Sequence, residues 1–172
     1  MKKAPDRRPG GAIGRGLRLL VLQPRFNDSV VAGLALGALD YLAEVGASSE
    51  VELVPGAFEL PLIAQAAART GRYDAIVALG AVIKGETDHY EHIAREAARG
   101  IMNASLTTGV PVAFGVLTVT NAAHAVARSG PSRQNKGREA AAAAVEAALL
   151  LRKISASPGK SAGAARPSPG PR

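Results

Sequence analysis

The chain has 172 residues and a formal net charge of +7, and 47% of its residues are hydrophobic although only 3% are aromatic. This length is enough for one domain with a substantial core, which must be built from aliphatic side chains. The absence of cysteine excludes disulfides and thiolate chemistry. No apolar run is long enough to span a membrane and the N-terminus lacks the apolar centre of a secretory signal, so we expect a cytoplasmic protein.

The positive charge lies at the two ends of the chain. Residues 1–16 carry five basic side chains against one acid, residues 155–172 carry three and no acid, and residues 17–154 are balanced. Both ends are rich in proline, glycine, alanine and serine, a composition typical of disorder. We therefore expect a disordered basic N-terminal tail at 1–16, a folded domain at 17–154 and a disordered C-terminal tail at 155–172. Loose contact of the tails with nucleic acid is the less favoured alternative.

Apolar runs alternate with helical patterns along the folded part. We expect strands at 17–22, 51–54, 75–79 and 111–117, and helices at about 28–45, 59–69, 88–107, 121–127 and 136–154. Strands that alternate with helices form parallel sheets with helices on both faces and right-handed crossovers. The predicted fold is therefore an α/β, three-layer α/β/α sandwich with a four-stranded parallel sheet, of the flavodoxin-like type.

The segment 74–93 organises the rest of the chain. A buried apolar strand (75–79) is followed by a glycine-bounded loop (80–85) and by a helix for which Thr87 or Asp88 is the expected N-cap. Ligands bind at the carboxyl ends of the strands in open α/β sheets, and helix N-termini attract phosphate. We therefore expect the functional site at this edge, where the loops after the first three strands meet.

Aromatic and histidine side chains mark the same edge. All three phenylalanines, Phe26, Phe58 and Phe114, lie in or beside these segments. Phe26, in a polar loop, suits stacking on a planar ligand, whereas core filling is the first explanation for Phe114 alone. His89 lies in the first helical turn beside the glycine loop, where an imidazole can act as a general acid or base near neutral pH. A surface histidine without a role is the alternative.

Other kinds of site are not supported by the spacing. His89 and His92 are three residues apart, but His124 lies on a different predicted helix, so we expect no metal. The glycine loop matches neither the phosphate loop of nucleotide triphosphatases nor the dinucleotide fingerprint. Lys84 and Arg128 each fit either a phosphate-binding role or a solvated charge, and spacing alone does not decide between them.

Five sequence blocks, in order and with nearly constant spacing, resemble the lumazine synthase family. They are PRFND at 24–28, VPGAFELP at 54–61, YDAIVALGAVIKGETDHYEHI at 73–93, TTGVPVAFGVLT at 107–118 and NKG at 135–137. The resemblance covers about residues 17–154. It implies the penultimate enzyme of riboflavin synthesis, which condenses 5-amino-6-(D-ribitylamino)uracil with 3,4-dihydroxy-2-butanone 4-phosphate to 6,7-dimethyl-8-ribityllumazine, releasing phosphate and water. It implies no metal and no organic cofactor.

The resemblance also assigns roles to individual residues. The substrate-binding positions it implies are Phe26, Ala57, Phe58, Glu59, Ala81, Val82, Ile83, Glu86, Thr87, Phe114 and Arg128. Phe26 would stack on the pyrimidine, Glu59 would accept hydrogen bonds from ribityl hydroxyls, and Arg128 would pair with the phosphate. His89 would be the catalytic residue that moves protons. Phe114 and Arg128 would reach the site from an adjacent subunit.

The resemblance further implies a homo-oligomer of at least five subunits with sites at subunit interfaces, and it leaves a decamer or a sixty-subunit shell open. Segment 130–134 differs from the loop associated with such shells, which favours the smaller assemblies. Lys84, Thr120 and Ala127 also depart from residues common in the family. Partners are otherwise small-molecule substrates, with no membrane and no specific nucleic acid. A scaffold that has lost catalysis is the competing hypothesis.

Overall fold

Strands and helices alternate in the order β-α-β-α-β-α-β-α-α in the computed structural model, which describes residues 11–156. The strands are β1 (Arg18–Pro24), β2 (Ser48–Val54), β3 (Ala75–Ile83) and β4 (Val112–Val119). The helices are α1 (Asp28–Glu44), α2 (Leu60–Arg69), α3 (His89–Thr108), α4 (Ala122–Ser129) and α5 (Lys136–Ala156). The predicted order and type of every element are confirmed.

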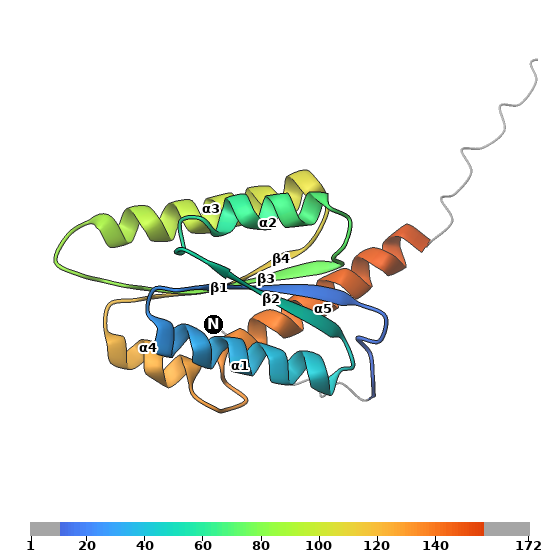
Figure 1. The fold of residues 1–172 in the computed structure, drawn as a ribbon, viewed down its shortest axis with the longest axis horizontal. Coiled ribbons are helices and arrows are strands. Elements are labelled where there is room, and N and C mark those ends of the chain that lie inside the picture. Colours follow the sequence, from blue (N-terminus) through green and yellow to red (C-terminus); the bar gives the residue numbers. More distant parts are fainter. Residues whose placement is uncertain (1–10, 157–172) are drawn as a thin grey trace, which may run out of the picture.

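The four strands form one parallel sheet in the order β2-β1-β3-β4. Helices α2 and α3 cover one face, and α1, α4 and α5 cover the other, which confirms the three-layer α/β/α sandwich (Figure 1). Because the strands are parallel, their carboxyl ends share one edge, at the left of Figure 1, where α1, α2 and α3 begin. The strand order reverses between β1 and β3, which is where ligands bind in such sheets.

The two interior strands explain the continuous apolar runs of the sequence. Alternate side chains of β1 point to opposite faces, so Leu19 packs in the core under α1 and α5 while Leu20 packs under α2. Both core layers are built almost entirely from aliphatic side chains, as the low aromatic content requires, and Tyr41 and Tyr73 are their buried aromatic residues. The edge strand β2 is different, because only its last residue, Val54, is buried.

The segment 80–83 is β-strand, although the two glycines at 80 and 85 predict a loop. Gly80 is opposite Val116 and Ile83 is opposite Val119 in the parallel ladder with β4. A Cβ on Gly80 would lie 3.2 Å from Val116 Cγ1, so the glycine serves close side-chain packing rather than a turn. The loop begins only at Lys84, whose backbone N–H donates to the Val119 carbonyl at 2.9 Å.

The described region includes part of each predicted tail. Gly14 is buried and donates its backbone N–H to the Val45 carbonyl at 2.8 Å, so residues 11–16 pack against the end of α1. Helix α5 continues to Ala156, two residues beyond its predicted end. Residues 1–10 and 157–172, which hold the rest of the predicted tails, lie outside the described residues. Within residues 11–156, no helix combines the length and apolarity needed to cross a membrane.

Two clusters of charged and aromatic side chains link neighbouring elements of the fold. Arg138 of α5 pairs with Glu44 of α1 and lies 5.2 Å from the centre of the Tyr41 ring. The hydrogen bond from Arg138 lowers the pKa of Glu44, while burial raises the pKa of Tyr41. On the other side, the Tyr73 hydroxyl donates to Glu50 at 2.6 Å and holds the edge strand β2 in place.

Candidate active site

The loop after β1 carries the most exposed phenylalanine and is tied to the end of β3. The Phe26 side chain is 72% exposed, which is unusual for a large apolar ring. Asn27, at the N-cap position of α1, has a left-handed backbone with φ of 55° and makes no side-chain capping bond. Its side-chain amide instead donates to the Ala81 carbonyl at 2.7 Å. This bond fixes the Phe26 loop against β3, where the strand order reverses.

The loop after β2 brings a carboxylate beside this ring. A Cβ built on Gly56 would lie 3.0 Å from Glu59 Oε2 and 3.4 Å from Phe26 Cδ2. The Glu59 carboxylate and the Phe26 ring therefore border the same space beside Gly56, and they reach it from two different loops. Glu59 is the N-cap residue of α2, and Pro61 lies in the first turn, as the sequence predicted. Phe58 is also exposed, at 55%.

The end of β3 and the start of α3 complete this edge. Ala81 and Val82 are buried at 7% and 8%, so the strand end can present only backbone groups to a ligand. The residues from Lys84 to His89, including Glu86 and Thr87, are exposed. Asp88 is the N-cap of α3, but its side chain makes no capping bond, which leaves the first two backbone N–H groups of the helix open to an anion.

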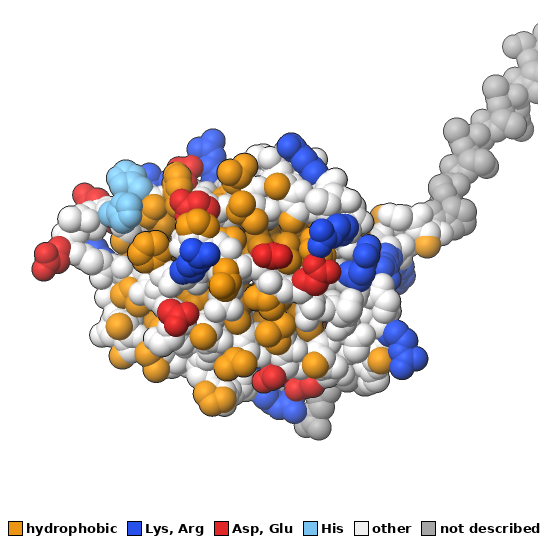
Figure 2. Space-filling view, viewed as in Figure 1, with side chains coloured by type: hydrophobic (Ala, Val, Ile, Leu, Met, Phe, Trp, Pro, Cys, Tyr) orange, Lys and Arg blue, Asp and Glu red, His pale blue; other side chains and the backbone are white. Residues whose placement is uncertain are grey.

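His89 is the first residue of α3 and therefore lies at the carboxyl edge, as predicted. The histidine side chains visible in Figure 2 gather at the end of the molecule where α3 begins. Within residues 11–156, no three His, Asp or Glu side chains are placed to hold a metal ion.

Phe114 and Arg128 line a separate groove. This groove has a volume of about 420 Å³ and lies between β4, the end of α4 and the start of α5, where Lys136 and Glu139 also face it. Phe114 is 43% exposed, so the interpretation that it fills the core is wrong. The Arg128 guanidinium donates to the His124 carbonyl at 3.0 Å, and Lys136 pairs with Glu139 at 2.6 Å.

The predicted site residues thus form two sets in one chain. Phe26, Glu59 and His89 do not line the groove of Phe114. Phe114 lies five positions before the end of β4 at Val119, and five residues of strand span roughly 16 Å. A single chain therefore does not assemble all the predicted side chains around one cavity.

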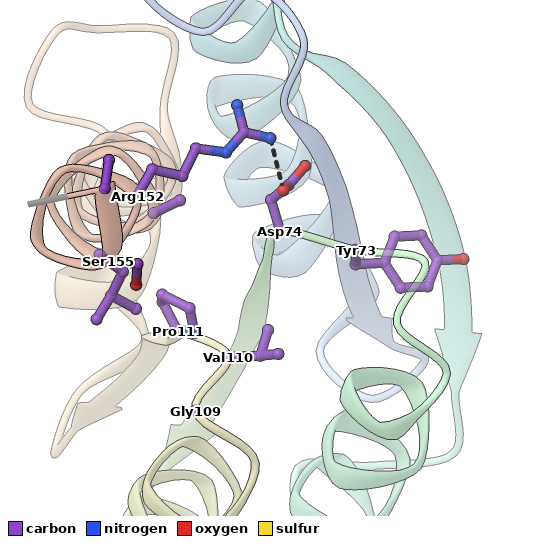
Figure 3. A pocket seen from close by; sticks show the side chains of 10 residues that line it. Tyr73, Asp74, Gly109, Val110, Pro111, Arg152 and Ser155 are labelled. Atoms are coloured by element: carbon purple, nitrogen blue, oxygen red, sulfur yellow. Dashed lines mark hydrogen bonds and ion pairs between the residues drawn. The ribbon is translucent and has the colours of Figure 1, made fainter. Parts of the chain in front are cut away.

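A larger hollow, of about 530 Å³, lies at the opposite edge, where β3 and β4 begin. Figure 3 shows its main polar feature, the ion pair of Arg152 with Asp74 at 2.7 Å. Arg152 also donates to the Gly16 carbonyl, and Asp74 accepts the backbone N–H of Arg18. These charged groups bond to each other and to the backbone. The hollow therefore offers a ligand fewer available polar groups than the carboxyl edge does, although it is larger than the groove.

Three residues of the site were not recognised from the sequence. The Asn27 side chain ties the loop after β1 to the end of β3. Gly56 makes room for Glu59 and Phe26. Asn135 is a buried hydrogen-bonding residue behind the groove. The signal for Asn27 and Gly56 was their place directly after strands, which is where parallel sheets present ligands.

Comparison with known proteins agrees with the five sequence blocks. A family model described as 6,7-dimethyl-8-ribityllumazine synthase matches residues 16–152. A protein of that name from Thermococcus gammatolerans is 50% identical over 146 residues, which cover 84% of this chain and 94% of the relative. Another from Syntrophus aciditrophicus is 47% identical over 148 residues, covering 84% of this chain and 96% of the relative. The chain therefore belongs to the 6,7-dimethyl-8-ribityllumazine synthase family.

Proposed function

We propose that the carboxyl edge of the sheet, completed by the groove of a neighbouring subunit, performs the reaction of this family. The enzyme is a transferase of riboflavin biosynthesis. It condenses 5-amino-6-(D-ribitylamino)uracil with 3,4-dihydroxy-2-butanone 4-phosphate to 6,7-dimethyl-8-ribityllumazine. Phosphate and water are released.

The observation that carries the assignment of residues is the meeting of Phe26 and Glu59 at Gly56. The exposed Phe26 ring offers a flat apolar face to the pyrimidine. The Glu59 carboxylate is an acceptor for ribityl hydroxyls, together with the neighbouring Ala57 and Phe58. Because the side chains of Ala81 and Val82 are buried, they and Ile83 bind the pyrimidine edge through backbone groups.

The reaction needs orientation and proton transfer more than strong activation of its substrates. The amine attacks the ketone carbonyl and water leaves, which gives an imine. Elimination of phosphate and ring closure with loss of a second water then give the product. Holding an amine beside a ketone supplies much of the rate, and His89 at the start of α3 moves the protons. The open N–H groups of that helix, with Glu86 and Thr87, hold the butanone phosphate.

Phe114 and Arg128 enter the site from the adjacent subunit of a pentamer. In a head-to-tail interface of cyclic symmetry, one surface of a chain packs against a different surface of its neighbour. Such an interface is needed to bring the Phe114 groove of one subunit to the carboxyl edge of the next. Large exposed apolar side chains on the outer helices support such packing, with Leu62 at 69%, Met102 at 60% and Leu106 at 76%. Each interface then holds one site.

Replacing Arg128 tests the phosphate role. The Arg128→Ala variant should raise the KM for 3,4-dihydroxy-2-butanone 4-phosphate by roughly tenfold to a hundredfold, because a charge-assisted hydrogen bond contributes about 1.5–3 kcal/mol. The KM for the amine substrate should change less than about twofold, since phosphate contacts alone are lost. Product formation is followed by the absorbance of the lumazine.

Arg133→Ala is the matched control, because Arg133 is an exposed arginine in the loop that follows α4. It should behave as the unaltered protein. An unchanged KM for the phosphate substrate in Arg128→Ala would remove Arg128 from the site. Absence of product from the unaltered protein with both substrates would favour the scaffold hypothesis.

A further inference from the structure

The groove that carries Arg128 is held from behind by one buried side chain. Asn135, between α4 and α5, is 2% exposed. Its Nδ2 atom donates to three carbonyls, those of Ser129 at 2.8 Å, Gly33 at 2.9 Å and Gly130 at 3.1 Å. The amide group therefore joins the end of α4 to the middle of α1.

The other end of the same amide caps α5. Asn135 Oδ1 accepts the backbone N–H groups of Gly137 at 2.8 Å and Arg138 at 3.1 Å. The amide oxygen faces two N–H donors and the amide nitrogen faces three carbonyl acceptors. Only this orientation of the amide satisfies every partner. The side chain thus bonds to three helices at once, and all of its hydrogen-bonding capacity is used.

The surrounding backbone is shaped for this contact. A Cβ on Gly37 of α1 would lie 2.7 Å from Asn135 Nδ2, and a Cβ on Gly33 would lie 3.3 Å from the Ser129 carbonyl carbon. Two glycines one helical turn apart therefore open a slot in α1 for the loop. Little room remains for the end of α4 to shift as long as the amide is present.

Arg128 depends on this anchor because it lies directly before the two anchored carbonyls, those of Ser129 and Gly130. Its own side chain is exposed and contacts only the His124 carbonyl of the same helix among the hydrogen bonds of the described residues. The position of the guanidinium in the groove is therefore set by the backbone of the last turn of α4. That turn is fixed to α1 through Asn135.

We propose that Asn135 is a positioning residue for phosphate recognition, acting through Arg128; this rests on the function proposed above. It touches no substrate. It holds the last turn of α4 so that the guanidinium meets the phosphate of the butanone substrate without reorganisation. Without the Nδ2 bonds, the last turn of α4 adopts several positions. The apparent affinity for the phosphate then falls in proportion to the fraction of molecules in which this turn is correctly placed.

Two replacements separate positioning from stability. In Asn135→Ser the hydroxyl can still cap α5 but is too short to reach the carbonyls of α4 and α1, whereas Asn135→Ala loses both functions. Both variants should raise the KM for the phosphate substrate about five- to twentyfold, with kcat changed less than about threefold. The thermal midpoint should fall clearly more in Asn135→Ala than in Asn135→Ser.

Val45→Ala is the control for stability, because Val45 is fully buried just beyond the other end of α1. It should lower the thermal midpoint and leave both KM values unchanged. If the KM for the phosphate substrate in the Asn135 variants instead follows the thermal midpoint, as in a purely structural role, the proposal is overturned.

A double-mutant cycle with Arg128→Ala distinguishes this proposal from the one on which it rests. If Asn135 acts through Arg128, adding Asn135→Ser to Arg128→Ala should raise the phosphate-substrate KM no further. Full additivity would overturn the positioning role. If Arg128→Ala alone leaves that KM unchanged, the proposed function of Arg128 fails; if only the Asn135 variants leave it unchanged, the positioning role fails alone.

Discussion

A His89→Ala variant is expected to lose roughly a hundredfold or more in kcat and yet to retain measurable activity. A positioned general acid or base contributes about 10²–10⁴ in rate, and the orientation of two reactive substrates accounts for what remains. His89 is the first residue of α3 and exposed at the carboxyl edge, so its removal leaves no buried gap and should leave the fold unchanged. Single-turnover formation of the lumazine, measured with saturating substrates, gives the effect on the chemical step.

His92→Ala provides the matched control for this experiment. His92 lies on the same helix, three residues further along, and is also exposed. Its replacement should leave kcat within about twofold, because it lies beyond the first helical turn that follows the loop after β3. Full activity in His89→Ala, or an equal loss in both variants, would rule out a specific proton-transfer role for His89.

A Gly137→Ala variant is expected to be the most destabilised of the single substitutions considered. A Cβ at this position would overlap the Leu34 carbonyl group and lie 2.9 Å from Leu34 Cα, so α1 and α5 would have to separate. Overpacking usually costs about 1–3 kcal/mol, and a clash between two backbones belongs at or above the top of that range. The thermal midpoint should fall on the order of 10 °C at matched protomer concentration.

Gly130→Ala is the control for Gly137→Ala. Gly130 has an extended backbone, with φ of −66°, and a Cβ there would have only the Val126 carbonyl oxygen nearby, at 3.7 Å. This alanine should leave the midpoint unchanged or raise it slightly, because it restricts the unfolded chain at no structural cost. Equal midpoints for the two variants would show that α1 and α5 are not in the contact described.

The layers of the fold were predictable because local pattern and tertiary environment agree. The interior strands β1 and β3 are buried on both faces at residues 19–22 and 75–82, and these stretches are therefore unbroken apolar runs. The prediction of a loop at residues 80–83 was wrong, because glycine is common both in turns and at closely packed strand positions. Gly80 lies within β3 because Val116 packs against it, but two glycines five residues apart also fit a loop, and no local signal separates these cases.

Of the candidate site, the sequence predicted only where the loops lie. Topology alone places the loops carrying Phe26, Glu59 and His89 at one edge, because parallel strands end together. The approach of Phe26 and Glu59 to the same side of Gly56 depends on side-chain geometry that sequence spacing does not contain. The hydrogen bonds of Asn135 were likewise not predictable, because its partner in α1, Gly33, is about a hundred residues away in sequence.

The proposed site takes its second half, Phe114 and Arg128, from an adjacent subunit. Phe114 is on the edge strand and Arg128 is exposed, so neither position reveals a partner by burial within the chain. Only the resemblance to the family assigned them to an adjacent subunit. The central claim is therefore that each active site takes His89 from one chain and Arg128 from the next.

Mixed assemblies of His89→Ala and Arg128→Ala subunits test this claim most directly. The two variants are produced together in equal amounts, and activity is measured at a low concentration of the butanone phosphate, where each parent alone is nearly inactive. Random mixing in a ring makes about a quarter of the interfaces intact, so activity should recover to roughly a quarter of that of the unaltered protein. Activity no higher than the average of the two parents would contradict a shared site.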